Sequence, residues 1–136
     1  MKTDCNIVLD TNVLVSAIWS PGRNATDILT SVFAGKYSVC YDYRILEEYE
    51  RVLNYSKFQF SKWEIHSILD PIIKNGISVV AEPILSLPFP DDSDRKFYEV
   101  AKFCQAVLVT GNLKHFPQDT GIISVADFCR CTSQEK

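Results

Sequence analysis

Short apolar runs alternate with amphipathic segments along most of the 136-residue chain. The runs have the length of buried strands, and the segments between them repeat hydrophobic residues at the three- and four-residue spacing of a helix. Strands that alternate with helices form parallel sheets, because each helix carries the chain back to the same edge. The pattern therefore predicts an α/β fold with a parallel sheet. Five strands are expected, at residues 5–9, 37–41, 77–81, 106–110 and 122–124.

Helix signals stand between these strands. Thr11 or Asn12 can cap a first helix, which the Pro21-Gly22 pair would end. Ser61 followed by Glu64 has the capping-box pattern of a helix start. The remaining helices are expected at residues 24–34, 43–54, 61–76 and 92–104, with a short final one from residue 124.

The length of the chain fits one domain, predicted at residues 1–131 with a polar tail at 132–136. No apolar run approaches the roughly 18 residues needed to span a bilayer, and the first residues lack the pattern of a signal peptide. The odd number of cysteines, five, favours free thiols in a reducing compartment. No second pair of Cys or His accompanies Cys129 and Cys131 at zinc-site spacing. We therefore expect a cytoplasmic protein with no membrane association and no structural zinc.

The net charge is −3, from 14 basic and 17 acidic residues. This balance argues against a broad basic surface of the kind that grips nucleic acid over a long interface. The objection weakens where several carboxylates converge on bound cations, because the cations reverse the local field. A basic partner, or a basic rim around one local site, is also compatible with this charge.

Polar side chains follow three of the predicted strands. Asp10 comes directly after the first, Thr110 and Asn112 end the fourth, and an acidic run at residues 91–94 follows the third after a proline-bounded loop. In a parallel sheet these places meet at the carboxyl edge, where ligands bind. Clustered carboxylates repel one another unless a cation lies between them, and oxygen ligands suit magnesium or manganese. The sequence therefore indicates a metal site at this edge.

Each acid also has a structural interpretation when it is taken alone. Asp10 could be a helix cap or turn former, and the acids at residues 91–94 could stabilise the start of the next helix. Glu48 has Glu47 and Glu50 beside it and could belong to a solvated helix face. Their occurrence together is what favours a shared site.

Four motifs carry a family resemblance. The segments at residues 7–17, 45–53, 91–97 and 107–112 resemble, in order and spacing, the acidic motifs of PIN domains. The second motif places its acid four residues before a Val-Leu pair, which selects Glu48. The third places its acid seven residues before an alanine, which selects Asp94. Residues 114–116 continue the match, so the resemblance spans residue 7 to about residue 127.

The resemblance implies a three-layer α/β/α sandwich whose parallel sheet has about five strands. It implies metal-dependent cleavage of single-stranded RNA with magnesium or manganese (Mg2+ or Mn2+). Within the family the chain is most similar to the toxin-like branch of toxin–antitoxin systems, which implies homodimers or higher oligomers and an antitoxin protein that occludes the site. One departure stands out: Asn112 occupies a place where the family usually has Asp.

The motif positions give each residue a hypothetical role. Asp10, Glu48 and Asp94 would hold the metal, with Asn112 completing the catalytic set, and a metal-activated water would attack the phosphodiester in line. Waters or carboxylates would be oriented by Thr11, Asn12, Ser16 and Thr110. Asp91 or Asp92 would supply the charge that Asn112 lacks. Residues that would contact the substrate phosphate are Lys114, His115 and Arg95. Arg95 and Lys96 could instead be ordinary surface charges of a helix.

Other functions stay open at this point. A catalytically weak or inactive PIN fold could bind RNA or an antitoxin without cleavage. A phosphatase of the haloacid-dehalogenase type also begins with an Asp after its first strand, but it needs a second Asp two residues later, where this chain has Asn12. A phospho-receiver domain fits less well still, because it needs an early acidic pair.

Overall fold

The computed structural model describes residues 6–133 and shows five parallel strands in the order β3-β2-β1-β4-β5. The strands are β1 (Asn6–Leu9), β2 (Ser38–Tyr41), β3 (Ile77–Ser78), β4 (Val107–Thr110) and β5 (Ile122–Ser124). The helices of the described residues are α1 (Thr11–Trp19), α2 (Asn24–Phe33), α3 (Tyr43–Leu53), α4 (Lys62–Asn75), α5 (Arg95–Cys104) and α6 (Val125–Ser133). Two short 3-10 turns are η2 (Asp92–Asp94) and η3 (Leu113–His115).

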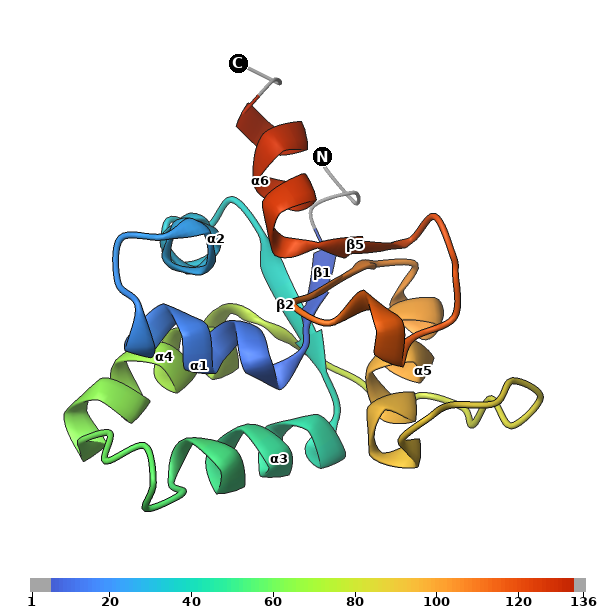
Figure 1. Cartoon of the computed structure of the whole chain (residues 1–136), viewed down its shortest axis with the longest axis horizontal. Coiled ribbons are helices and arrows are strands. Elements are labelled where there is room, and N and C mark those ends of the chain that lie inside the picture. Colours follow the sequence, from blue (N-terminus) through green and yellow to red (C-terminus); the bar gives the residue numbers. More distant parts are fainter. Residues whose placement is uncertain (1–5, 134–136) are drawn as a thin grey trace.

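Helices cover both faces of this sheet. Figure 1 shows α1, α2 and α4 on one side of the strands and α5 on the other, where α5 packs against β1, β2 and β4. The predicted α/β/α sandwich with a parallel sheet of five strands is therefore confirmed. None of the helices within residues 6–133 is long and apolar enough to cross a membrane.

The central strands are buried, as the apolar runs predicted. Ile7, Val8 and Leu9 of β1 are each at most 1% exposed, and β4 contributes Leu108 and Val109 with no exposed surface. Strands covered on both faces read as continuous hydrophobic runs rather than as alternating patterns. This is why the strand positions could be read from short apolar segments.

Helix α3 is fixed to the carboxyl end of β1 by a buried hydrogen bond. The side chain of Tyr49 is completely buried, and its hydroxyl donates to the carbonyl oxygen of Leu9 at 2.6 Å. Asp42, which follows β2, caps the start of α3 by accepting a hydrogen bond from the amide of Ile45 at 3.0 Å. These two contacts set the position of Glu48, the neighbour of Tyr49, relative to the sheet edge.

One strand differs from its predicted length. Strand β3 covers only Ile77–Ser78 instead of residues 77–81, because its partner β2 ends at Tyr41 and the chain there turns into α3. The final helix was predicted without an end, and α6 extends to Ser133. Residue 5, the predicted start of the first strand, and residues 134–136 of the predicted tail lie outside the described residues.

Three cysteines of the described residues, Cys40, Cys104 and Cys131, are free thiols. Cys40 is buried in β2, Cys104 and Cys129 are half-buried, and Cys131 is exposed. The prediction of free thiols therefore holds for Cys40, Cys104 and Cys131, and Cys5 lies outside the described residues.

Gly76, directly after α4, allows a close approach between α4 and β2. A methyl group at this position would lie 2.3 Å from the carbonyl oxygen of Ile72 and 2.6 Å from that of Val39, and both are backbone atoms. We expect Gly76→Ala to lower the free energy of unfolding by about 1–3 kcal/mol, because the backbone would have to shift.

Urea unfolding measures this change. Gly121→Ala is the matched control, because a methyl group there would meet only the Asp119 carboxylate, at 3.4 Å. Equal stability losses in the two variants would contradict the packing explanation.

Candidate active site

Asp10 lies at the junction of the carboxyl ends of β1 and β4. Its amide donates to the carbonyl oxygen of Val109 at 3.0 Å, and its side chain is only 6% exposed. Thr110 Oγ1 donates to Asp10 Oδ2 at 2.7 Å. Asp10 and Thr110 therefore lie side by side at the ends of adjacent strands, as predicted from the strand ends.

Asn12 links the two loops that leave these strands. Its side-chain nitrogen donates to Asp10 Oδ2 at 3.4 Å, and its side-chain oxygen accepts from the amide of Gly111 at 3.1 Å. A methyl group on Gly111 would lie 3.2 Å from that same Asn12 oxygen. The close approach of Gly111 lets Asn12 hold the rim around Asp10.

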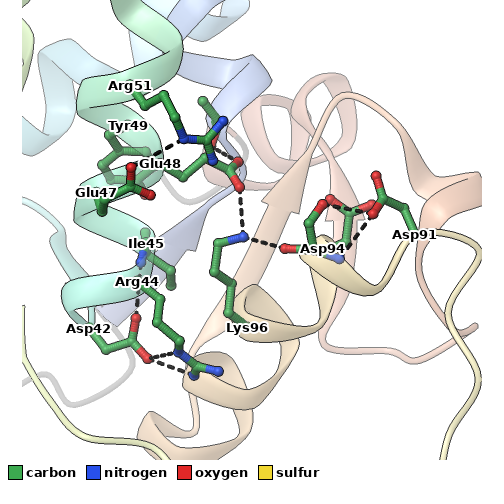
Figure 2. Close-up of polar contacts among 12 residues, drawn as sticks. Asp42, Arg44, Ile45, Glu47, Glu48, Tyr49, Arg51, Asp91, Asp94 and Lys96 are labelled. Atoms are coloured by element: carbon green, nitrogen blue, oxygen red, sulfur yellow. Dashed lines mark hydrogen bonds and ion pairs between the residues drawn. The ribbon is translucent and has the colours of Figure 1, made fainter.

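Glu48 reaches the same edge from α3. Thr11 Oγ1 donates to Glu48 Oε2 at 2.5 Å, and the Lys96 ammonium lies 2.6 Å from Glu48 Oε1. The side chains of Glu48 and Lys96 are each 12% exposed. Figure 2 shows Lys96 extending from α5 to Glu48, with Asp94 on the other side of the ammonium group.

Asp94 comes from η2, immediately before α5, and its side chain is 14% exposed. Its Oδ2 atom is buried and has no hydrogen-bond partner among the described residues. Nδ1 of His115 lies 3.2 Å from this oxygen, which is within ion-pair distance but outside hydrogen-bonding geometry. A buried carboxylate oxygen without a hydrogen bond is costly, and such oxygens are suited to binding a cation.

The three carboxylates share one electrostatic environment. The pKa of Asp10 is raised from 3.8 to about 6, chiefly by burial; the charges of Asp94 and Glu48 act in the same direction, and the Thr110 hydrogen bond opposes them. Burial also raises the pKa of Asp94; the charges of Asp91 and Glu48 act in the same direction, and the neighbouring His115 opposes the shift. The negative charges of Asp10 and Asp94 are thus disfavoured, and a cation beside them would remove that penalty.

This site has the type of ligand atoms that a metal ion needs, but not a preformed arrangement of them. Within residues 6–133 no three side chains of His, Cys, Asp or Glu stand together in an arrangement that could hold an ion. Both oxygens of Glu48 are already bound, one by Lys96 and the other by Thr11. The donor atoms are nonetheless carboxylate oxygens, which magnesium and manganese prefer. The residues therefore fit a hard divalent cation once Glu48 exchanges its partner.

His115 connects Asn112 to this cluster. Its Nε2 atom lies 3.1 Å from the Asn112 side-chain nitrogen, while its Nδ1 atom faces Asp94. The backbone amide of Asn112 donates to Thr110 Oγ1 at 2.9 Å. Asn112 is therefore held at the rim, and an imidazole separates its side-chain amide from Asp94.

The two preceding acids, Asp91 and Asp92, have local partners. Asp91 Oδ1 accepts from the amide of Ser93 at 3.0 Å and from its hydroxyl at 2.8 Å, and these bonds lower the pKa of Asp91. Asp92 is 2.7 Å from the Arg95 guanidinium. Both carboxylates are exposed, and they shape the turn that presents Asp94.

Arg95 supports the proline-bounded loop. Its guanidinium donates to the carbonyl oxygens of Ile84 at 2.8 Å and Leu87 at 2.7 Å, and it lies over the ring of Phe89 at 4.7 Å. The side chain is 14% exposed. These contacts, together with the Asp92 pair, use Nε and Nη1 of the guanidinium and hold Arg95 against the loop.

The remaining predicted residues lie further out. Ser16 is exposed on α1 and Lys114 is exposed on η3, and neither side chain contacts the carboxylates within the described part of the chain. Lys114 stands next to His115 and so flanks the cluster. The structure thus brings together Asp10, Thr11, Asn12, Glu48, Asp94 and Thr110, with Asn112 and His115 at the rim.

Two features of the site were not predicted from the sequence. Lys96 is a partner of Glu48 rather than a surface charge, and nothing local in the sequence relates these two positions. Glu99 is 2% exposed and binds both Arg44, at 2.8 Å, and the amide of Ile84. Asp42, the residue after β2, pairs with Arg44 at 2.6 Å, and its place at a strand end was the one available signal.

In an all-parallel α/β sheet, carboxylates gathered at the ends of the central strands lie at the edge where ligands bind. The PIN domain family matches residues 6–114, which is most of the chain. The chain belongs to the PIN domain family. Members of this family are generally nucleases and typically use divalent metals. No curated protein matches the sequence.

Proposed function

We propose that this protein is a metal-dependent endoribonuclease that cleaves single-stranded RNA with a metal-activated water. The observation that carries this proposal is the convergence of Asp10, Glu48 and Asp94 from three separate elements, with the buried Asp94 Oδ2 lacking a hydrogen bond. Family membership supports nucleolysis, and the motif resemblance supports RNA as the substrate and magnesium or manganese as the metal.

Asp10, Glu48 and Asp94 would hold the ion. When bound, Mg2+ or Mn2+ supplies a water of lowered pKa and stabilises negative charge on the phosphoryl oxygens. Thr110 and Asn12 orient the Asp10 carboxylate, and Thr11 orients that of Glu48. These hydrogen bonds keep the carboxylates in fixed positions. Losing such partners typically lowers metal affinity or activity by about 10- to 100-fold.

Contacts to the RNA phosphate are proposed at the rim. His115 and the exposed Lys114 lie on η3 beside the carboxylates and can present positive charge or a hydrogen-bond donor to a backbone oxygen. Arg95 is committed to the loop at Ile84 and Leu87, and its role is to hold the turn that carries Asp94. Asn112 contributes an amide rather than a charge, so the ion is held with one negative charge fewer than in the family pattern.

The biological setting is also a proposal. The motifs resemble the toxin-like branch of the family, which supports the role of a toxin component in the cytoplasm, assembled as a homodimer or higher oligomer. An antitoxin protein would then occlude the carboxylate cluster. The net charge of −3 is compatible with a basic partner at this surface.

The test is cleavage of a mixed-sequence single-stranded RNA. We expect strand scission in manganese or magnesium and none in a chelator. Folded protein that leaves the RNA intact with both metals would overturn the nuclease proposal.

A binding module without cleavage is the second candidate. The observations in its favour are Asn112 in the place of an acid and the occupation of Glu48 by Lys96. Manganese and RNA binding without turnover would support it, and Asn112→Asp would then be tested for a gain of cleavage.

A further inference from the structure

The Lys96–Glu48 ion pair lies inside the candidate active site rather than on the surface. The ammonium is 2.6 Å from Glu48 Oε1, and only 12% of each side chain is exposed. The ammonium also donates to the carbonyl oxygen of Ser93, the residue before Asp94. Lys96 therefore connects α3 to the turn that carries Asp94, as Figure 2 shows.

This ion pair is the obstacle to metal binding. A lysine ammonium and a divalent cation are alternative partners for the same carboxylate oxygen, and Thr11 already takes the other oxygen of Glu48. Without a metal, the positive charge of Lys96 offsets the mutual repulsion of Glu48 and the neighbouring acids. With a metal, that charge is no longer needed at Glu48.

Two contacts other than the Glu48 pair hold the Lys96 ammonium at the cluster. Its ammonium lies 5.1 Å from the centre of the Phe97 ring, and Phe97 is completely buried. The hydrogen bond to Ser93 keeps the ammonium beside Asp94. A displaced ammonium would thus stay at the cluster with two of its three donors free, and a phosphate oxygen is the partner of opposite charge that the substrate brings.

We propose that Lys96 is an exchangeable counter-ion, which neutralises Glu48 in the metal-free protein and binds the RNA phosphate once the metal has taken Glu48. This inference rests on the proposed function. It assigns Lys96 as a substrate-positioning residue and makes metal binding a condition for a productive RNA contact.

The test compares Lys96→Gln with the wild type in two binding measurements. Manganese affinity is measured by titration calorimetry, and affinity for a single-stranded RNA is measured by fluorescence anisotropy in calcium at several salt concentrations. We expect Lys96→Gln to bind manganese about tenfold more tightly, because the competing charge is gone. We expect its RNA affinity to fall, with a salt dependence lower by about one phosphate contact.

Lys102→Gln is the matched control, because Lys102 also lies on α5 and pairs with an acid, Asp119, outside the carboxylate cluster. It should leave manganese affinity unchanged. Lys96→Arg retains the positive charge and should keep manganese affinity near that of the wild type.

The exchange predicts opposite changes in Lys96→Gln: manganese affinity should rise and RNA affinity should fall. Weaker or unchanged manganese binding would overturn the competition, and unchanged RNA binding with an unchanged salt dependence would overturn the phosphate contact. If neither the wild type nor Lys96→Gln binds manganese, it is the proposed function that fails. If both bind it equally, only the role of Lys96 fails.

A measurement on the wild type covers the case in which Lys96→Gln does not fold. Ammonium-selective NMR during a magnesium titration should show the Lys96 signal changing its chemical shift and exchanging faster with water. A Lys96 signal that magnesium leaves unchanged, while other site resonances shift, would contradict the exchange.

Discussion

Asp10→Asn should reduce metal-dependent RNA cleavage by at least about a hundredfold and should stabilise the metal-free protein. The loss of activity follows from the loss of one of the three negative charges that would hold the ion. The fold should survive, because an asparagine oxygen can still accept the hydrogen bond from Thr110.

The gain in stability follows from the raised pKa of Asp10. Its pKa is about 6 in the folded protein against 3.8 for an ordinary carboxyl, so folding disfavours the charged form. The penalty is absent below pH 4, grows as the pH rises from about 4 to 6, and is complete above 6. We expect Asp10→Asn to be more stable above pH 6 by up to about 3 kcal/mol, and similar to the wild type below pH 4.

Chelator-treated proteins unfolded in urea between pH 4 and 8 test this difference, and an RNA cleavage assay follows the activity. Asp70→Asn is the control, because Asp70 is 69% exposed and lies on α4. Cleavage that persists in Asp10→Asn would point to a contaminating nuclease or to a different site. A less stable Asp10→Asn at pH 8 would contradict the electrostatic account.

Arg44→Met should lower the free energy of unfolding by about 3 kcal/mol, the largest stability loss that we expect from removing one charged side chain. Arg44 binds Asp42 at 2.6 Å and Glu99 at 2.8 Å, and these acids are 4% and 2% exposed. Its removal leaves two buried carboxylates without a counter-charge. Asp42 caps α3, and Glu99 binds the backbone amide of Ile84. Loss of Arg44 should therefore weaken both the start of α3 and the loop at Ile84.

Arg51→Met on the same helix is the matched control. Arg51 pairs with Glu47 at 3.2 Å, but both side chains are about half exposed or more, so we expect a loss below about 1 kcal/mol. Combining Arg44→Met with Glu99→Gln should recover part of the stability, because one uncompensated charge is then removed. Equal effects of Arg44→Met and Arg51→Met in urea unfolding would show that burial does not decide the cost.

The sheet and one half of the site could be predicted from the sequence. Continuous apolar runs mark strands that are buried on both faces, and the parallel order then fixes where they end. Asp10 and Thr110 follow directly from that argument. The length of β3 did not, because it depends on where its neighbour β2 turns away, and this is a property of the partner and not of residues 77–81.

The other half depended on the motif resemblance or escaped prediction. Glu48 sits among other acids on α3, and only the spacing of the family motif selected it. Lys96 and Glu99 could not be foreseen, because a charge on an amphipathic helix gives no local sign that it will be buried against a distant partner. Arg95 had the composition of a phosphate contact, whereas packing turned it toward Ile84 and Leu87.

The central claim is that Asp10, Glu48 and Asp94 together bind a divalent metal ion. Anomalous diffraction from crystals grown with manganese tests it most directly, because manganese can be located independently of any assumed ligand. The account predicts an anomalous peak in contact with these three carboxylates, with the Lys96 ammonium displaced from Glu48. A peak elsewhere, or crystals of folded protein in which Lys96 still binds Glu48 and no manganese is found at Asp94, would contradict it.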